Sequence, residues 1–143
     1  MYRLIASIAI AFCAVAAPFA GASAKTLVAQ VDLSEQRLHV VYKGERLASW
    51  AVSTGRAGYR TPTGVFRPMR MYREYYSKQY DGAPMPNAIF YDRGYAIHGS
   101  YEVGSLGRPA SHGCVRLHPA DAEKLFELVI EVGAENTAIQ VIR

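Results

Sequence analysis

The sequence predicts a mainly-β domain, a compact β-sandwich or partly closed barrel with one short C-terminal α-helix. Two patterns indicate this class. Short runs of β-branched and aromatic residues, separated by turns that contain glycine, recur along most of the chain. Such runs are typical of antiparallel strands joined by hairpins. Apolar residues at clear helical spacing follow residue 118, near the C-terminal end.

The expected strands span residues 26–31, 37–42, 46–53, 65–66, 88–91, 95–97 and 137–142. Turns or loops are expected at residues 43–45, 54–58, 61–64 and 92–94, and a glycine-rich loop at 99–110. His39 lies in an alternating strand, where we expect a structural or exposed histidine. Trp50 is expected in the core.

The helix is expected to begin near Pro119, because proline is tolerated in a first helical turn, and to end at Gly133. Its negative charges lie near its N-terminal end, as the helix dipole prefers. His118, just before it, is a candidate cap. The apolar stripe and the acidic residues of this segment are Ala122, Leu125, Phe126, Val129, Asp121 and Glu123.

Residues 1–24 have the pattern of a secretory signal peptide. Arg3 supplies a positive charge, residues 4–17 are almost unbroken apolar sequence, and Ala22-Ser23-Ala24 is a small-x-small cleavage site. The apolar stretch is shorter than the roughly 20 residues of a permanent membrane helix, although an uncleaved anchor remains the alternative. We therefore expect an exported protein with no permanent membrane span, whose single domain covers residues 25–143.

Composition narrows the function. The chain has 143 residues and a net charge of +4, but it has no basic run or nucleic-acid-binding motif, so nucleic acid is not an expected partner. Of its two cysteines, Cys13 lies in the predicted signal peptide. Cys114 would then be a free thiol in an oxidising compartment. It is either a small buried hydrophobe or a reactive group.

Two short motifs favour the reactive group. Ile97-His98-Gly99-Ser100 ends a predicted strand, and Ser111-His112-Gly113-Cys114-Val115-Arg116-Leu117 follows the glycine-rich loop. A nearby imidazole can take the proton of a thiol, and both His98 and His112 are candidates. The loop is long enough to bring Cys114 back beside His98. Gly113 permits a tight turn that could direct N–H groups at a developing oxyanion.

These motifs resemble the YkuD-type L,D-transpeptidase catalytic domain. Val52-Ser53-Thr54-Gly55 and Thr61-Pro62-Thr63-Gly64 are also similar to that family, and the resemblance covers about residues 26–143. The chain departs from some members by a shorter interval between the histidine and cysteine motifs, and by Arg116 where they have asparagine. The family fold is a compact β-sandwich with a short helix.

The resemblance implies a role for each motif residue. Cys114 would be the nucleophile and His98 its general base, with the imidazole oriented by the backbone carbonyl of Gly99. Ser111, His112 and Gly113 form the turn before the nucleophile. This turn would contribute to the oxyanion hole together with the Cys114 amide. Arg116 would either bind a substrate carboxylate or brace the loop through backbone carbonyls.

The implied reaction is an acyl transfer in the periplasm. The thiolate attacks a peptidoglycan tetrapeptide stem between diaminopimelate and the terminal D-alanine, and an amine then resolves the thioester. The acceptor would be another stem (a 3-3 cross-link), a free D-amino acid or an outer-membrane protein. No metal or cofactor is implied, and carbapenems are expected to acylate the cysteine.

Several alternatives stay open at the level of sequence. Water as acceptor would make the protein a carboxypeptidase, and a related amidase would detach proteins from the wall. A catalytically silent peptidoglycan-binding module is a further possibility. A zinc site would need His98, His112, Cys114 and His118 together, without a recognised zinc spacing. Residues 67–88 alternate basic residues with tyrosines, which predicts either a substrate groove or a solvated flap.

Overall fold

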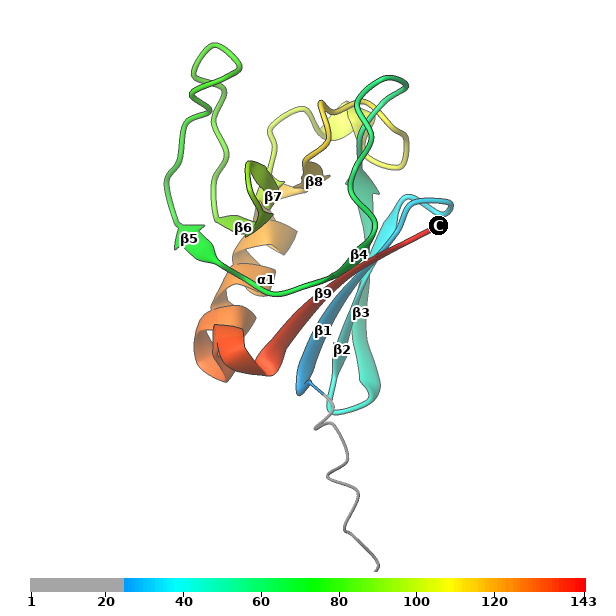
Figure 1. Ribbon diagram of the computed structural model, residues 1–143, viewed down its shortest axis with the longest axis vertical. Coiled ribbons are helices and arrows are strands. Elements are labelled where there is room, and N and C mark those ends of the chain that lie inside the picture. Colours follow the sequence, from blue (N-terminus) through cyan, green and yellow to red (C-terminus); the bar gives the residue numbers. More distant parts are fainter. Residues whose placement is uncertain (1–24) are drawn as a thin grey trace, which may run out of the picture.

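The computed structural model describes residues 25–143 (Figure 1). The predicted signal peptide, residues 1–24, lies outside the described residues. The chain forms a mainly-β domain in which a curled, half-barrel sheet is covered by one α-helix among the described residues. This is the fold class that the sequence predicts. The strands are β1 Leu27–Asp32, β2 Arg37–Tyr42, β3 Glu45–Ser53, β4 Gly64–Phe66, β5 Arg70–Tyr72, β6 Ala88–Asp92, β7 Tyr95–Gly99, β8 Val115–Leu117 and β9 Thr137–Ile142.

The sheet has two halves joined by the long strand β3. The strand order is β4-β9-β1-β2-β3-β8-β7-β6-β5. β1, β2 and β3 form the predicted antiparallel meander, and the end of β3 pairs with β8. β9 lies parallel to β1, and β8 lies parallel to β7. Parallel strands need long connections: the glycine-rich loop connects β7 to β8, whereas β1 and β9 are separated by most of the domain, residues 33–136.

Helix α1, Pro119–Val132, packs its apolar stripe against the core of the sheet. Its buried residues are the four predicted ones, Ala122, Leu125, Phe126 and Val129. The predicted His118 cap is also present, because its Nδ1 accepts the Ala120 N–H at 3.1 Å. Full burial of each large aliphatic side chain contributes about 1.5–3 kcal/mol, so this stripe fixes the helix beneath β6 and β7.

Some local expectations are changed by the structure. Trp50 is half-buried against the edge of the core rather than inside it. His39 is structural, because the residue is 6% exposed and its Nε2 lies 3.2 Å from Glu35 Oε2. β5 was not expected, and it adds an outer strand beside β6. Within residues 25–143, no helix has the length and apolar character to cross a membrane.

Candidate functional site

The pairing of β7 with β8 places the two sequence motifs side by side. Ile97 pairs with Val115 and His98 with Arg116. Because side chains alternate along a strand, Ile97 and Val115 enter the core, while His98 and Arg116 share the opposite face. Cys114 precedes β8 and lies two residues before Arg116, so it belongs to that same face. The predicted return of the chain to the end of β7 is confirmed.

Hydroxyl groups hold the turn that presents Cys114. Ser111 Oγ accepts the Gly113 N–H at 3.0 Å and donates to the Cys114 carbonyl at 2.6 Å. From the other side, Thr61 Oγ1 accepts the Gly55 N–H and donates to the Gly113 carbonyl, both at 2.9 Å. The Gly113 N–H is therefore committed to Ser111, so the expectation that it serves an oxyanion is not supported by this arrangement.

Gly113 is required by both backbone and space. Its φ is +116°, a region that L side chains rarely adopt. A Cβ at this position would also lie 2.6 Å from Cε1 of Tyr95. The prediction of a tight glycine turn before Cys114 is confirmed in these terms.

His98 is held as a neutral, oriented imidazole. Its ring is 6% exposed, and its Nδ1 lies 2.7 Å from the Gly99 carbonyl. Because a carbonyl can only accept, Nδ1 carries the proton, which leaves the Nε2 lone pair for the cavity. Burial lowers the pKa of His98 to about 4, assisted by the charge of Arg116 and opposed by the Gly99 bond. The predicted Gly99 contact is present.

The thiol of Cys114 lies in a partly buried position at the cavity wall. Burial raises its pKa, whereas a backbone hydrogen bond from Ala96 and the positive charge of Arg116 lower it. Sγ also lies 3.9 Å from the Gly94 carbonyl. At neutral pH the resting pair is therefore a neutral thiol beside a neutral imidazole.

His112 faces a different set of partners. Arg56 Nη2 lies 3.1 Å from its Nε2, Tyr80 stacks on its ring at 4.2 Å, and Tyr59 meets it edge-on at 4.7 Å. Desolvation and then the charges of Arg56 and Arg116 lower the pKa of His112. Because these contacts occupy Nε2 and one ring face, His112 is less suited than His98 to accept a proton from Cys114.

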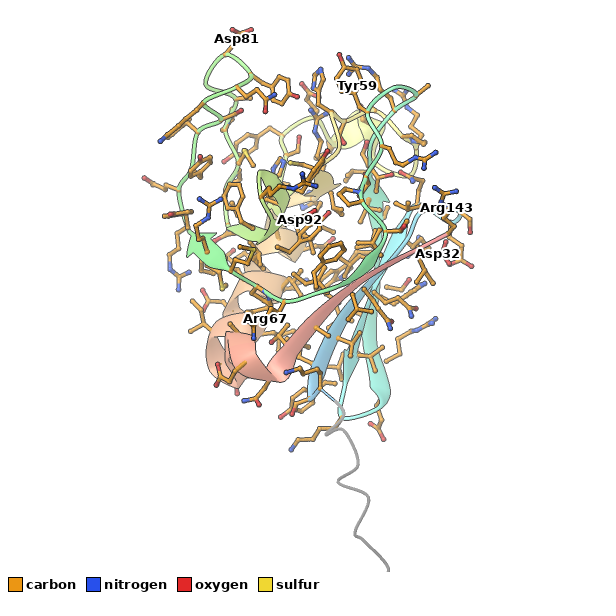
Figure 2. All side chains as sticks on the ribbon, in the orientation of Figure 1. Asp32, Tyr59, Arg67, Asp81, Asp92 and Arg143 are labelled. Carbon is orange, nitrogen blue, oxygen red and sulfur yellow. The ribbon has the colours of Figure 1, made fainter. Side chains whose placement is uncertain are left out.

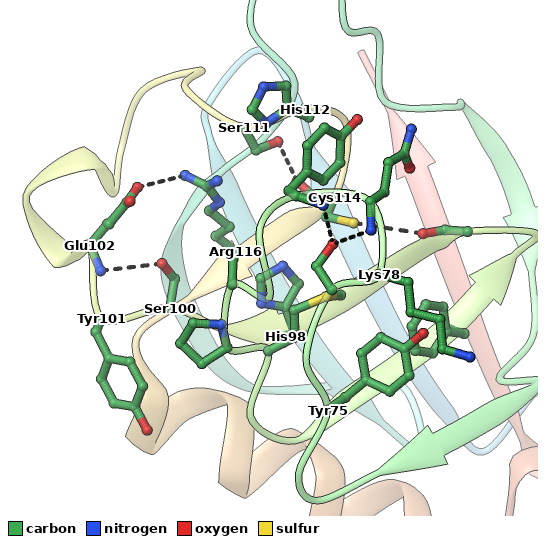
Figure 3. A pocket seen from close by; sticks show the side chains of 18 of the residues that line it. Tyr75, Lys78, His98, Ser100, Tyr101, Glu102, Ser111, His112, Cys114 and Arg116 are labelled. Carbon is green, nitrogen blue, oxygen red and sulfur yellow. Dashed lines mark hydrogen bonds and ion pairs between the residues drawn. The ribbon is translucent and has the colours of Figure 1, made fainter.

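A cavity of about 570 Å³ lies over these residues. Figure 3 shows the side chains of His98, Cys114 and Arg116 converging on it. The opposite wall comes from residues 73–87, here called the flap, and includes Tyr75, Lys78, Tyr80 and Met85. The volume of the cavity suits a peptide-sized ligand.

The flap is a hairpin between β5 and β6. Backbone bonds join Arg73 to Asn87, Tyr75 to Met85 and Ser77 to Ala83. The tip is an Asp81-Gly82 turn with φ values of 49° and 67°, the combination that favours tight hairpins. Figure 2 shows Asp81 at this tip and Tyr59 on the facing loop. Of the two sequence interpretations, the substrate groove fits the position of the flap over the cavity.

Metal-binding groups do not gather within the part of the chain that the structure describes. No three His, Cys, Asp or Glu side chains in residues 25–143 are arranged to hold a metal ion. His118, one of the four residues of the zinc alternative, caps α1 instead. The zinc alternative therefore lacks structural support.

Several residues of the site carry little or no signal in the sequence. Thr61 lies in a motif that is similar to the family, but only the fold shows that its hydroxyl bonds the turn before Cys114. Glu102 pairs with Arg116 across the cavity rim; nothing in its sequence context indicates this. Tyr80 and Arg56 reach His112 from distant segments. For Tyr80, the alternation of tyrosines with basic residues in 67–88 is a signal in the sequence.

Both the sequence and the fold are similar to those of known proteins. The sequence model of the L,D-transpeptidase catalytic domain family (YkuD) matches residues 27–140. Among solved structures, the chain is similar to an L,D-transpeptidase (Yku) from Stackebrandtia nassauensis, with 30% identity and a TM-score of 0.73 over 88% of this chain and 60% of that one. No curated protein sequence matches the chain.

Two further structures have the same fold. An LD transpeptidase, LdtMt1, in complex with imipenem is 25% identical, with a TM-score of 0.72 over 82% of this chain and 59% of that one. An L,D-transpeptidase from Mycobacterium smegmatis is 22% identical, with a TM-score of 0.73 over 83% of this chain and 59% of that one. The chain thus spans about 60% of the length of these structures.

Proposed function

Since this chain belongs to the L,D-transpeptidase catalytic domain family, we propose that it is a cysteine-dependent transpeptidase of peptidoglycan stem peptides. One observation carries the proposal. The thiol of Cys114 and an imidazole with a fixed tautomer, His98, lie on one face of the β7–β8 pair and line the same cavity. A nucleophile with an oriented base is the arrangement that acyl transfer through a thioester requires.

The first half of the reaction forms the thioester. Cys114 Sγ attacks the carbonyl carbon of the peptide bond between diaminopimelate and D-alanine, and its proton passes to His98 Nε2. The tetrahedral oxyanion needs N–H donors; the amides of His112 and Cys114 are the candidates in the turn. The C–N bond then breaks, and His98 returns the proton to the departing D-alanine amine.

The second half consumes an amine. An incoming amine attacks the thioester carbon, gives its proton to His98, and releases the thiolate, which is reprotonated. The acceptor amine would come from a second stem, a D-amino acid or an outer-membrane protein, while water would give hydrolysis.

The protonation states argue against a resting thiolate–imidazolium ion pair. Burial raises the pKa of Cys114 and lowers that of His98 to about 4. In the resting protein at neutral pH the proton therefore lies on sulfur. A neutral thiol also avoids the desolvation cost that an unpaired thiolate would carry at this partly buried position.

The decisive experiment incubates the purified protein with a disaccharide-tetrapeptide and identifies the products by mass. We expect loss of D-alanine with formation of dimers in the wild type. Cys114→Ala should abolish turnover. His98→Ala should lower the rate about a hundredfold or more, as expected for a general base, and His112→Ala should lower it less.

Each alternative has its own outcome in this assay. Free tripeptide without dimers identifies a carboxypeptidase, exchange with added D-amino acids identifies that acceptor, and release of wall-linked protein identifies a detaching amidase. Binding of the stem without any product would identify a silent binding module and would contradict the proposal.

The proposed site of action is the periplasm, supported by the signal-peptide pattern of residues 1–24. The full-length chain expressed in a Gram-negative host should yield a periplasmic product that begins at Lys25. A product that retains residue 1 and sediments with membranes would instead indicate the uncleaved anchor.

A further inference from the structure

The charges on the cavity wall are unbalanced. Three cationic side chains, Arg70, Lys78 and Arg116, line the cavity, against one carboxylate, Glu102. His98 adds no charge at neutral pH, because its pKa is about 4. A cavity with this surplus favours anionic ligands, and its low-dielectric walls strengthen that preference.

Arg116 and Glu102 form an unequal pair inside this cavity. Arg116 Nη1 donates to Glu102 Oε2 at 2.9 Å, and the two side chains are 19% and 72% exposed. The guanidinium is therefore part of the wall, on β8 two residues after Cys114. The carboxylate reaches it from the solvent side, from the loop that follows β7 (Figure 3).

The guanidinium keeps unused binding capacity. It has five N–H donors in a planar fork that matches a carboxylate, and the structure records one hydrogen bond from it within the described residues. Glu102 satisfies part of that fork with the same chemical group that an acidic substrate would bring. When a substrate carboxylate displaces Glu102, Arg116 exchanges one charge-assisted hydrogen bond for another. The exposed Glu102 carboxylate returns to water at little cost.

We propose that Arg116 is a carboxylate-binding subsite beside the nucleophile, and that Glu102 occupies it until a substrate carboxylate displaces it. The subsite selects acyl donors that carry a carboxylate near the reacting carbonyl. Its assignment to a stem-peptide carboxylate rests on the proposed function, whereas the subsite itself can be tested without it. A purely bracing role for the pair predicts no such selection.

The test uses two small alkylating reagents that differ in charge. The Cys114 thiolate attacks the CH₂ carbon of iodoacetate or iodoacetamide and releases iodide, so it gains a carboxymethyl or a carbamoylmethyl group. The ratio of the two rates cancels the thiolate fraction and reports the effect of the carboxylate. The rates are measured in the full chain by mass spectrometry of the peptide that carries Cys114. The variants are Glu102→Gln, Arg116→Gln and, as a matched loss of one negative charge, Asp81→Asn at the flap tip.

We expect Glu102→Gln to raise the iodoacetate-to-iodoacetamide ratio by about threefold or more, since it frees the guanidinium. Arg116→Gln should lower the ratio by about tenfold, the scale of a hydrogen bond to a charged group. Asp81→Asn should leave it nearly unchanged. A ratio unaffected by Glu102→Gln, or raised equally by Asp81→Asn, would overturn the subsite in favour of bracing or a general field.

A second arm identifies which carboxylate binds, using stem peptides with either the terminal D-alanine or the diaminopimelate side-chain carboxylate converted to an amide. Arg116→Gln should raise KM for the natural stem and have no effect on the form that lacks the relevant carboxylate. An equal effect on every form overturns the subsite. If the wild type shows no turnover of any stem peptide but the variants change the iodoacetate-to-iodoacetamide ratio as expected, the transpeptidase activity is refuted and the subsite is retained.

Discussion

Thr61 provides a sharp test of how the turn before Cys114 is held. Its side chain is 2% exposed, and its hydroxyl bridges the Gly55 N–H and the Gly113 carbonyl at 2.9 Å each. Thr61→Val keeps the shape and removes both bonds. Each orphaned buried polar group costs about 1–3 kcal/mol, so the two groups together should lower the free energy of unfolding by about 2–6 kcal/mol.

The assay is urea denaturation followed by circular dichroism, with Thr61→Ser as the matched control. Serine keeps the hydroxyl and loses one methyl group, worth about 1 kcal/mol. In the folded Thr61→Val protein, acylation of Cys114 by imipenem should also slow, because the Gly113 carbonyl is no longer held. Wild-type stability of the valine variant would refute the reasoning, since the bridging hydroxyl would then contribute nothing.

Three further predictions follow from the same geometry. The pKa of His98 is about 6.5 in the unfolded chain and about 4 in the folded chain. Acidification from pH 7 to 4.5 should therefore lower the free energy of unfolding of the wild type by about 2–3 kcal/mol more than that of His98→Gln. Equal losses of the two proteins in urea titrations would contradict this. Gly113→Ala should destabilise the fold by more than about 2 kcal/mol and block carbapenem acylation, since its Cβ would meet Tyr95 at 2.6 Å; wild-type thermal stability would refute this. Tyr80→Ala should speed amide hydrogen exchange at the flap tip by freeing it from His112, whereas Tyr80→Phe should not, and slow exchange in both would remove the stacking role.

Local sequence patterns determine much of this fold. The period-2 strands, the glycine turns and the amphipathic stripe of α1 each carry their own signal, so β1 to β3, β6, β7, β9 and the helix were predictable. β5 and β8 were not, because each is only three residues long and shows no clear periodicity. Trp50 lies at the margin of the core for a similar reason: aromatic character predicts burial but not its extent.

The centre of the site was predictable for a different reason. His98, Gly99, Ser111 and Cys114 lie in two compact motifs whose residue types suit one another chemically. Their partners come from distant segments, so contacts such as Thr61 to the turn and Glu102 to Arg116 depend on the path of the loops. The raised pKa of Cys114 was also beyond sequence reasoning, because burial is its first cause.

The most direct measurement of the central claim is the mass of the protein after incubation with imipenem, combined with peptide mapping. Our account predicts one adduct per chain, located on Cys114, absent from Cys114→Ala and formed much more slowly by His98→Gln than by His112→Gln. An adduct on another residue, or one that forms at the wild-type rate in His98→Gln, would contradict the assignment of this thiol and imidazole as nucleophile and base.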